Sequence, residues 1–515
     1  MVRPSFELSR PPFAQRTPRS KALLLAGATV LALVPFVNKA FHIDDTLFLA
    51  AARQIRSAPL DFYGFAINWY GTVMPMSDVM KNPPLTSYFI AAVMSITGER
   101  EIPLHLAFLL PAVAAILGTL ALARRLCARP ASAALVTLST PVFLISATNL
   151  MCDTMLLAFW VWAVALWIRG IETRRAGPLM AAAVLAAYQQ WTLALYGRGL
   201  LFDAASYATE RSGLGTLRPD KVIVGLSFAG GCFAPAALFL PWLWGRAAFV
   251  GAALAALIGF AFVSAGHLGS AALRIPTDAP GPALQIVLFV LAGACVLALG
   301  AADLFRLRDA ASLLLFLWLV GTLVFAVFFN WTINGRSLLA AAPAVGILTV
   351  RRLERGRGPV PRLPLAAAFL LTLAVTWSDF RLAASARTAA AQITRRDAAG
   401  PAKLWFEGHW GFQHYMEARG ALPLDVRRSR LEAGDRIVIP VNNTNVFPPA
   451  PGTVVPRSEV DLAAFPYLTT MSPELGAGFY SDIWGPFPFV FGRVPPDRYL
   501  VLEVVRAVMA GGILG

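Results

Sequence analysis

The chain has 515 residues, of which 57% are hydrophobic and only 14% charged, and its mean hydropathy is +0.62. A soluble protein of this length needs more charged surface, so these values exclude an ordinary water-soluble globular protein. The net charge of +15 does not indicate nucleic-acid binding, because the basic residues form short runs between apolar blocks, as in the cytoplasmic loops of membrane proteins.

In chain order, the first element is an apolar block that follows a basic lead-in and carries no convincing cleavage site, which predicts an uncleaved signal-anchor helix. Ten similar blocks follow, so we predict an α-helical polytopic membrane protein with about 11 transmembrane helices, range 11–13. An N-terminus in the cytoplasm places every basic run on the cytoplasmic side and the C-terminus outside. The predicted segments are 21–37, 103–122, 131–147, 153–169, 178–199, 222–242, 247–265, 281–301, 312–330, 338–350 and 364–378.

Two regions interrupt the alternation of apolar helix and short loop. Residues 38–102 form a long first external loop, apolar and aromatic enough to contain short helices at the membrane interface. Residues 379–515 have more charge, more proline and short β-rich runs, which predicts a small extracytoplasmic α/β domain. Within it, 405–420 is expected to form a strand, a glycine-containing turn and a helix. Residues 1–378 are then the membrane module.

The first candidate for chemistry is the acidic pair at the start of a helix predicted over 41–57. On a helix Asp44 shares an apolar face with Phe48, whereas Asp45 shares a face with Arg53. Burial on an apolar face would raise the pKa of Asp44 toward the value that a general base requires. The alternative is a helix cap next to a solvated acid.

Next along the chain, Lys81 and Asn82 precede Pro83 and Pro84, which fix an extended turn before an apolar helix. Lys81 lies on the predicted external side, against the usual charge bias. It is a candidate contact to a lipid phosphate, and Asn82 can bond to the same head group. The alternative for Lys81 is a side chain that only reaches the membrane interface.

Two further charged residues lie at external helix ends. Asp153 opens a predicted membrane helix, where an acid is either a favourable partner of the helix dipole or a functional group. Arg336 lies in an external turn and is either a structural anchor or a phosphate contact. The five histidines and four cysteines show no metal-ligand spacing, so no metal site is predicted from spacing.

Together these features resemble the GT-C glycosyltransferases, in the bacterial branch near protein O-mannosyltransferases and aminoarabinose–lipid A transferases. The resemblance covers roughly residues 1–350 and implies a polyprenyl-phosphate sugar donor. It implies Asp44 as general base with Asp45 the second candidate, and Asp153 as a further acid in the pocket. Lys81 and Arg336 match donor-phosphate contacts, the latter more loosely. The lining residues assigned with them are His42, Asn82, Pro83 and Pro84.

One departure from the family pattern lies in residues 188–192, which read YQQWT where relatives often have a lysine-containing turn. The implied reaction is direct displacement by an acceptor hydroxyl or amine, with inversion at the anomeric carbon. A divalent metal bridging acids and phosphate is left open by the sequence. The acceptor is a glycan, a lipid or a protein, and nucleic acid is not a partner.

Two other functions stay open at this point. A transporter or flippase for a lipid-linked compound would also place charges at the membrane boundary, but it should show broken helices in two related halves. A non-catalytic membrane scaffold would leave the four charged residues without a common purpose. The resemblance also implies a location in the bacterial cytoplasmic membrane, among its lipids.

Overall fold

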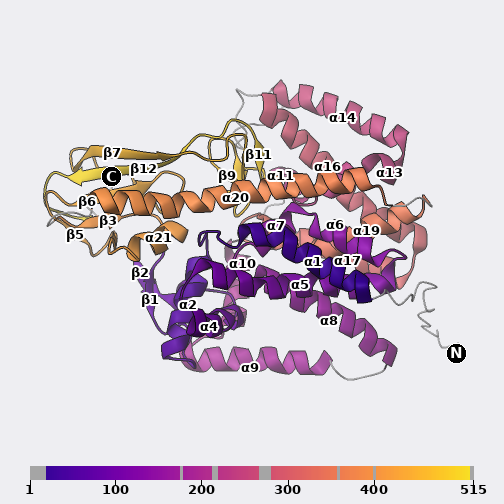
Figure 1. Ribbon diagram of the computed structural model, residues 1–515, viewed down its shortest axis with the longest axis horizontal. Coiled ribbons are helices and arrows are strands. Elements are labelled where there is room, and N and C mark those ends of the chain that lie inside the picture. Colours follow the sequence, from indigo (N-terminus) through magenta and orange to yellow (C-terminus); the bar gives the residue numbers. More distant parts are fainter. Residues whose placement is uncertain are drawn as a thin grey trace.

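The computed structural model describes residues 19–173, 178–211, 219–265, 280–356, 360–397 and 402–510. It has two parts, a set of apolar helices and a mixed β-sheet region, which one long helix, α20 (Arg362–Asp397), connects (Figure 1). This arrangement confirms the predicted fold class, a helical membrane protein with strands near its C-terminus.

Seven helices in the described part of the chain are long and apolar enough to cross a membrane, or eight if one bent pair counts as a single span. The bent pair, α6 (Pro130–Leu138) and α7 (Pro141–Ala147), changes direction by 66° just before Pro141. The seven are α1 (Arg19–Leu33, continued by Val34–Phe36), α5 (Glu101–Leu126), α8 (Asp153–Thr173), α14 (Arg246–Ser264), α16 (Pro280–Leu307), α17 (Ala310–Val324, continued by Phe325–Phe329) and α20.

The number of about 11 crossings stays a prediction, because several predicted segments form shorter pieces. Residues 222–242 are divided among three helices, and the later two have proline in their first turn. Proline lacks the N–H that continues a helical ladder, so it restarts a helix instead of extending one. Among the described residues, the other helices of the membrane part are α6 (Pro130–Leu138), α7 (Pro141–Ala147), α9 (Pro178–Tyr196), α10 (Leu200–Arg211), α11 (Pro219–Cys232), α12 (Ala234–Leu238), α13 (Leu240–Trp244), α18 (Gly335–Leu338), η3 (Leu339–Ala341) and α19 (Ala342–Glu354).

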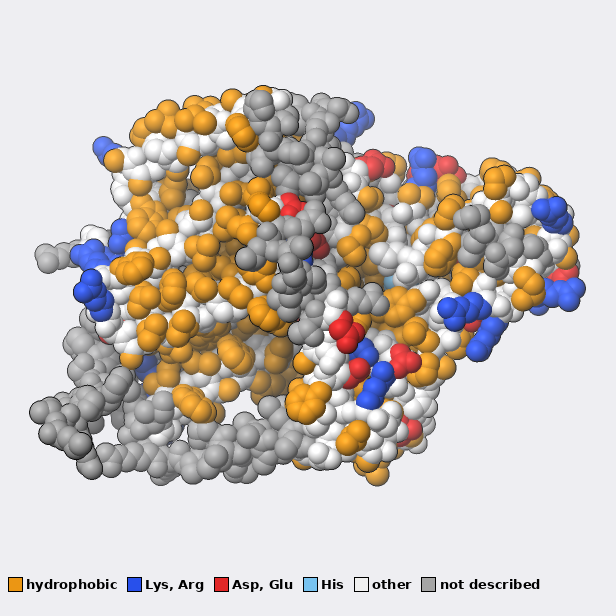
Figure 2. Space-filling view, turned by 180° about the vertical axis from the view of Figure 1, so that it is seen from behind, with side chains coloured by type: hydrophobic (Ala, Val, Ile, Leu, Met, Phe, Trp, Pro, Cys, Tyr) orange, Lys and Arg blue, Asp and Glu red, His pale blue; other side chains and the backbone are white. Residues whose placement is uncertain are grey.

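The outer surface of the helical part is broadly hydrophobic. Large apolar side chains point outward, among them Leu31, which is 76% exposed, and Ile258, which is 70% exposed. Figure 2 shows this apolar surface between basic side chains at one end and the charged β-rich part at the other. Such a surface suits lipid and not water. It confirms that the chain is a multi-pass membrane protein.

Inside the bundle, α11 and α16 approach each other closely at two glycines. A Cβ on Gly230 would lie 1.9 Å from the carbonyl oxygen of Phe289, and one on Gly293 would lie 2.1 Å from that of Leu226. Only glycine permits this separation. Small residues at helix contacts are the usual means of packing helices in a membrane, where van der Waals contact replaces the hydrophobic effect.

The first loop, 38–102, contains two amphipathic or apolar helices and one β-hairpin. The helices have 13 residues each, and a single short turn of helix follows the hairpin. The hairpin, which the sequence pattern did not predict, packs on the C-terminal region. The elements are α2 (Asp45–Ser57), β1 (Ala66–Asn68), β2 (Val73–Pro75), α3 (Met76–Val79) and α4 (Leu85–Thr97).

The C-terminal region is built on a five-stranded sheet in the order β4-β3-β6-β12-β7. Strand β3 is parallel to β4 and β6, whereas β12 is antiparallel to β6 and β7. The predicted strand, turn and helix at 405–420 are present, with Gly408 at φ +74° in the turn. These elements are β3 (Leu404–Phe406), α21 (Trp410–Glu417), β4 (Leu422–Pro423), β6 (Arg436–Pro440), β7 (Val454–Leu462) and β12 (Asp497–Val504).

Short two-residue strands complete this region. They are β5 (Arg430–Leu431), β8 (Leu468–Thr469), β9 (Met471–Ser472), β10 (Ala477–Gly478), β11 (Val490–Phe491) and β13 (Val508–Met509).

The predicted boundary between residues 378 and 379 falls inside α20. That helix has 36 residues, so it is about 54 Å long, well beyond the ~30 Å of a hydrocarbon core. Its first half runs beside the membrane helices, and its second half carries the sheet of the C-terminal region (Figure 1). A single rigid element therefore fixes one part of the molecule against the other.

Candidate active site

Three charged side chains from distant parts of the sequence meet at one point. Arg336 donates from Nη1 to Asp44 Oδ2 at 2.7 Å and from Nε to Asp153 Oδ2 at 2.9 Å. Asp44 is the most exposed of the three, with 28% of its side chain accessible against 16% for each of the others. Burial would lower the pKa of Arg336, but the two carboxylates outweigh it and raise that pKa.

Each of these side chains is held at the end of a helix. Asp44 precedes α2, Asp153 is the first residue of α8, and Arg336 lies in α18. Asn334 caps α18 by accepting from the Ser337 N–H at 2.8 Å. Because the ends of these three helices meet at one place, their terminal side chains can converge on one site.

The backbone before Asp44 is strained. Ile43 has φ +46°, a left-handed conformation that a β-branched residue rarely adopts. Such a residue costs on the order of 1–3 kcal/mol and persists only where its surroundings fix it. The conformation that places Asp44 is therefore imposed by contacts elsewhere in the fold.

The two neighbouring acids have exchanged the environments that the helical wheel predicts. Asp45, expected beside Arg53, is fully buried and accepts from the backbone N–H groups of His42 at 2.9 Å and Leu150 at 2.8 Å. Burial raises its pKa to about 7. Arg53 pairs with Glu99 instead, at 2.7 Å. The expectation fails because a wheel gives relative directions and does not include a distant loop that docks on the first turn.

The expected apolar surroundings of Asp44 are also wrong, since an arginine lies against it. Arg336 was expected to contact a donor phosphate, whereas its guanidinium lies between the carboxylates of Asp44 and Asp153. Contacts across almost 300 residues of sequence decide this arrangement, and local periodicity cannot contain them.

Lys81 belongs to a second charged cluster. Its Nζ lies 2.6 Å from Asp203 Oδ2, and Arg198 Nε lies 3.8 Å from the same oxygen. Arg198 also pairs with Asp78. Sequence reasoning did not select Arg198; its position just after the 188–192 departure, at the end of an apolar helix, was the available signal.

The turn after Lys81 lies against the helix of Asp153. The carbonyl of Asn82 accepts from the Tyr63 hydroxyl at 2.6 Å, and Thr86 Oγ1 lies 3.7 Å from the sulfur of Met155, in the first turn of α8. Pro83 is exposed and Pro84 is buried at the start of α4. The turn at residues 81–84 and the start of α8, which carries Asp153, therefore lie side by side.

His42 is buried beside the same loop. Its ring packs edge-on against Tyr480 at 5.3 Å, and its Nε2 lies 3.9 Å from Asp379 without a hydrogen-bond partner among the described residues. Burial lowers its pKa to about 4, although the nearby Asp379 opposes this. His42 is thus a neutral, buried ring beside the loop that carries Asp44, and its role as a lining residue stays a prediction.

Sequence reasoning missed a buried ion pair next to these residues. Lys39 Nζ lies 2.6 Å from Asp379 Oδ2, and both side chains are 0% exposed. A lysine just past the first predicted span and an aspartate one residue past the last predicted span, 364–378, were the signals that could have found them. Neither had an obvious partner in the sequence.

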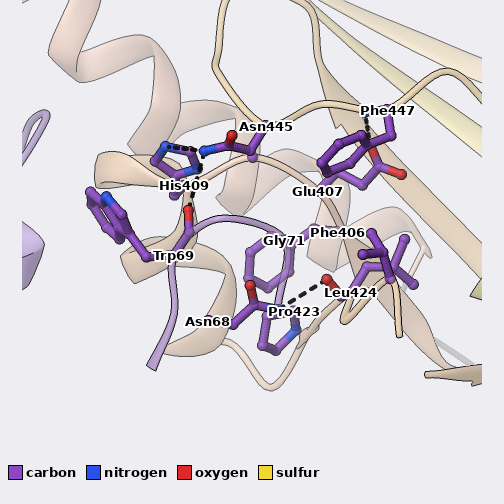
Figure 3. A pocket seen from close by; sticks show the side chains of 12 residues that line it. Asn68, Trp69, Gly71, Phe406, Glu407, His409, Pro423, Leu424, Asn445 and Phe447 are labelled. Carbon is purple, nitrogen blue, oxygen red and sulfur yellow. Dashed lines mark hydrogen bonds between the residues drawn. The ribbon is translucent and has the colours of Figure 1, made fainter. Parts of the chain in front are cut away.

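Where the β1–β2 hairpin meets the C-terminal region, a small pocket contains polar side chains (Figure 3). Its volume is about 10 Å³, enough for about one water molecule. His409 Nε2 lies 3.2 Å from Asn445 Nδ2, and the carboxylate of Glu407 accepts from the Phe447 N–H at 2.7 Å. Burial raises the pKa of Glu407 to about 7. This cluster fixes the hairpin to the sheet.

A larger cavity, about 220 Å³, lies between α20 and the C-terminal region. Leu382 lines it from the helix, and Asn442, Phe465 and Asp497 line it from the C-terminal region. Within the described ranges, no three His, Cys, Asp or Glu side chains gather in a way that could hold a metal ion.

Residues 81–204 match the family model described as dolichyl-phosphate-mannose-protein mannosyltransferase. No curated protein sequence matches the chain. Two crystal structures of ArnT from Cupriavidus metallidurans align with 82% of this chain and 94% of theirs, at 16% identity. The TM-score is 0.34 for the apo state and 0.32 for the complex with undecaprenyl phosphate. The family match confirms the predicted resemblance to GT-C glycosyltransferases of the protein O-mannosyltransferase branch.

Proposed function

We propose that this protein transfers a sugar from a polyprenyl-phosphate donor to an acceptor at the surface of the membrane. The observation that carries the proposal is the convergence of Asp44, Asp153 and Arg336 at one end of the apolar helices. The family match supports the donor class, since the matched model describes enzymes that use a polyprenyl-type phosphate sugar. A lipid phosphate is already a good leaving group.

In the proposed reaction, Asp44 acts as general base. Its carboxylate removes the proton of an acceptor hydroxyl or amine while the acceptor heteroatom forms a bond to the anomeric carbon. The bond from that carbon to the donor phosphate oxygen breaks, and its electrons leave with the polyprenyl phosphate. Displacement from the opposite side inverts the anomeric configuration. Asp44 suits this role because it is the most accessible member of the site.

Arg336 orients both acids through its planar guanidinium, whose geometry suits two carboxylates at once. Asp153 holds the opposite edge of that group. Because Arg336 already carries two acids, a donor phosphate would have to compete with them for it. We therefore assign Arg336 chiefly to the placement of Asp44.

Lys81 and Arg198 are better placed as phosphate contacts. Both lie against Asp203, so their positive charges already point toward one anionic group. A donor phosphate would compete there with Asp78 and Asp203, but it would meet two cations, whereas at Arg336 it would meet one.

The proposed orientation places the C-terminal region outside the bacterial cytoplasmic membrane and the N-terminus in the cytoplasm. Several helices begin near the candidate site and end in arginines, as α5 does at Arg124 and Arg125 and α19 at Arg351 and Arg352. Basic helix ends usually face the cytoplasm. The site and the C-terminal region then face the opposite side.

The test is a profile of lipid-linked sugars from cells that carry the wild type, Asp44→Asn or Asp461→Asn. Asp461 is the matched control, because it is an acid of β7 in an exposed ion pair with Arg498. We expect Asp44→Asn to accumulate one polyprenyl-phosphate sugar and to lose one glycan, with normal protein levels. If Asp44→Asn matches the wild type while deletion of the protein has a phenotype, a transporter or scaffold accounts for the chain better.

A further inference from the structure

The ion pair of Lys39 and Asp379 is the centre of a buried polar cluster. Lys39 Nζ also donates to Asn149 Oδ1 at 2.6 Å and to Thr148 Oγ1 at 3.2 Å. Asp379 accepts from the Thr470 hydroxyl at 2.7 Å and the Tyr480 hydroxyl at 2.9 Å. Asn149 closes the cluster by donating to the Tyr480 oxygen at 3.1 Å. Below, these six residues are called the Lys39 cluster.

The Lys39 cluster joins the two chain segments that carry the acids of the candidate site. Lys39 lies in the short loop that leads to Asp44, and Asn149 lies in the loop that leads to Asp153. A second tie runs in parallel, because Asp45 accepts from the Leu150 N–H at 2.8 Å. The separation of Asp44 and Asp153 is therefore fixed by buried groups that substrate does not reach.

The same C-terminal segment that supplies Thr470 and Tyr480 also holds the helix of Arg336. The Gly335 N–H donates to the carbonyl of Phe479 at 2.7 Å. A Cβ on Gly335 would lie 2.4 Å from the Phe479 ring, so a larger residue would push this segment away. Asp482 accepts from the Ile333 N–H at 3.0 Å. All three charged residues of the site are thus fixed by one segment.

A buried ion pair is a poor source of stability. Removing two charges from water costs several kcal/mol per ion, and apolar residues of similar volume often replace such a pair without loss. What a buried pair can supply is a defined geometry, since each partner accepts few arrangements. The strained backbone at Ile43, four residues after Lys39, fits a loop whose position is fixed by such contacts.

We propose that Lys39 and Asp379 are positioning residues, which set the placement of Asp44 relative to Asp153 and Arg336. Tyr480 extends this role to the C-terminal region, so residues 470–482 are part of the transferase and not an independent module. This inference rests on the proposed function, because it assigns these groups to the geometry of the same site.

The test compares two charge-free variants of the whole protein. Lys39→Met/Asp379→Leu removes the proposed positioning pair, and Arg351→Met/Asp303→Leu removes a buried pair at the opposite end of α19, 2.9 Å apart, whose acid also pairs with the partly exposed Arg355. Thermal unfolding in detergent reports stability, binding of undecaprenyl phosphate by tryptophan fluorescence reports the lipid site, and glycan formation in cells reports transfer. Tyr480→Phe is the mild variant, since it keeps the ring and loses two hydrogen bonds.

We expect both double variants to fold and to bind undecaprenyl phosphate like the wild type. Transfer should fall about 10- to 100-fold in Lys39→Met/Asp379→Leu, because small displacements of a catalytic group are costly, and stay near normal in the control. Tyr480→Phe should lose several-fold. Wild-type transfer by Lys39→Met/Asp379→Leu would overturn the inference. The proposed function fails separately, if Asp44→Asn transfers sugar as the wild type does.

Discussion

The guanidinium of Arg336 lies between two carboxylates, 2.7 Å from one and 2.9 Å from the other. Each carboxylate uses a different nitrogen, so the contact depends on a planar group with several donors in fixed directions. A lysine ammonium has the same charge but acts as a single point. The site therefore requires the planar shape of the guanidinium as well as its positive charge.

This distinction gives a prediction for Arg336→Lys. The variant should keep its fold but lose about 10- to 100-fold in sugar transfer, because one of the two acids is released from its position. Transfer in cells and thermal unfolding in detergent measure the two effects. Arg498→Lys is the matched control, because Arg498 also pairs with two acids but lies exposed in the C-terminal region. Normal transfer by Arg336→Lys would show that charge alone suffices at this position.

The adjacent acids Asp44 and Asp45 should respond differently to the same change. Asp45→Asn replaces one of two carboxylate oxygens that accept backbone N–H groups with an N–H₂ donor, so a buried N–H loses its acceptor. We expect a loss of about 1–3 kcal/mol in the free energy of unfolding. Asp44→Asn should unfold nearly like the wild type and lose transfer. Equal stability of the two variants would contradict the roles assigned here.

At the scale of elements, the β1–β2 hairpin is held to the sheet by buried polar groups. Gln413 donates to the carbonyl of Asn68 at 3.0 Å, and the Val73 N–H donates to Asp425 at 3.0 Å. Glu407 lies in the same contact and is 5% exposed. Its raised pKa means that the folded protein binds a proton there more tightly than the unfolded chain does.

Stability should therefore fall as pH rises from about 4.5 to about 7, the interval between the ordinary and the folded pKa of Glu407. Glu407→Gln keeps an acceptor for Phe447 and cannot ionise. Across this interval it should gain up to about 3 kcal/mol relative to the wild type. Glu459→Gln, on exposed β7, should follow the wild type. Unfolding midpoints from pH 4 to pH 8 measure this, and parallel curves would contradict it.

Much of the element pattern could be predicted from the sequence, because hydropathy and proline positions are local. The strand, turn and helix at 405–420 are an example, and so are the apolar spans at 103–122 and 281–301. The extension of α20 to Asp397 was not predictable from hydropathy, since its second half is polar on one side. The bend before Pro141, inside the single span predicted over 131–147, was also not predictable, because it depends on packing against neighbouring helices.

The members of the candidate site could be selected from the sequence, but their partners could not. Asp44, Asp153 and Arg336 were selected by their positions at helix ends, whereas their mutual contacts join residues far apart in the chain. Lys39 and Asp379 carried no motif, so only the fold brings them into view. Local patterns identify which residues are unusual, and tertiary contacts decide what each one touches.

At the scale of the whole molecule, the C-terminal region and the membrane helices share one hydrophobic core and are also joined by buried polar contacts. Gln285, at the start of α16, donates to the Phe489 carbonyl at 2.7 Å and accepts from the Phe491 N–H at 3.0 Å. Together with the Lys39 cluster, this contact places residues 470–491 over the site-bearing ends of the helices. The two parts should therefore unfold together and not as separate modules.

The proposed orientation makes a prediction of its own. In intact cells, a cysteine replacing exposed Arg428 in the C-terminal region should react with a membrane-impermeant maleimide, whereas one replacing Arg306 at the end of α16 should not. The native cysteines are buried or partly buried, which keeps the background low. Labelling of Arg306→Cys but not Arg428→Cys would reverse the orientation.

The central claim is that this chain moves a sugar from a lipid phosphate, with Asp44 as the base. The most direct measurement supplies purified wild-type protein, in lipid vesicles, with the lipid fraction and the remaining envelope extract from Asp44→Asn cells, which together contain donor and acceptor, and follows the anomeric configuration by NMR. We predict that the accumulated donor is consumed, polyprenyl phosphate is released and the new glycosidic bond is inverted, whereas purified Asp44→Asn leaves the donor intact. A donor left untouched by the wild type, or a product with retained configuration, would contradict it.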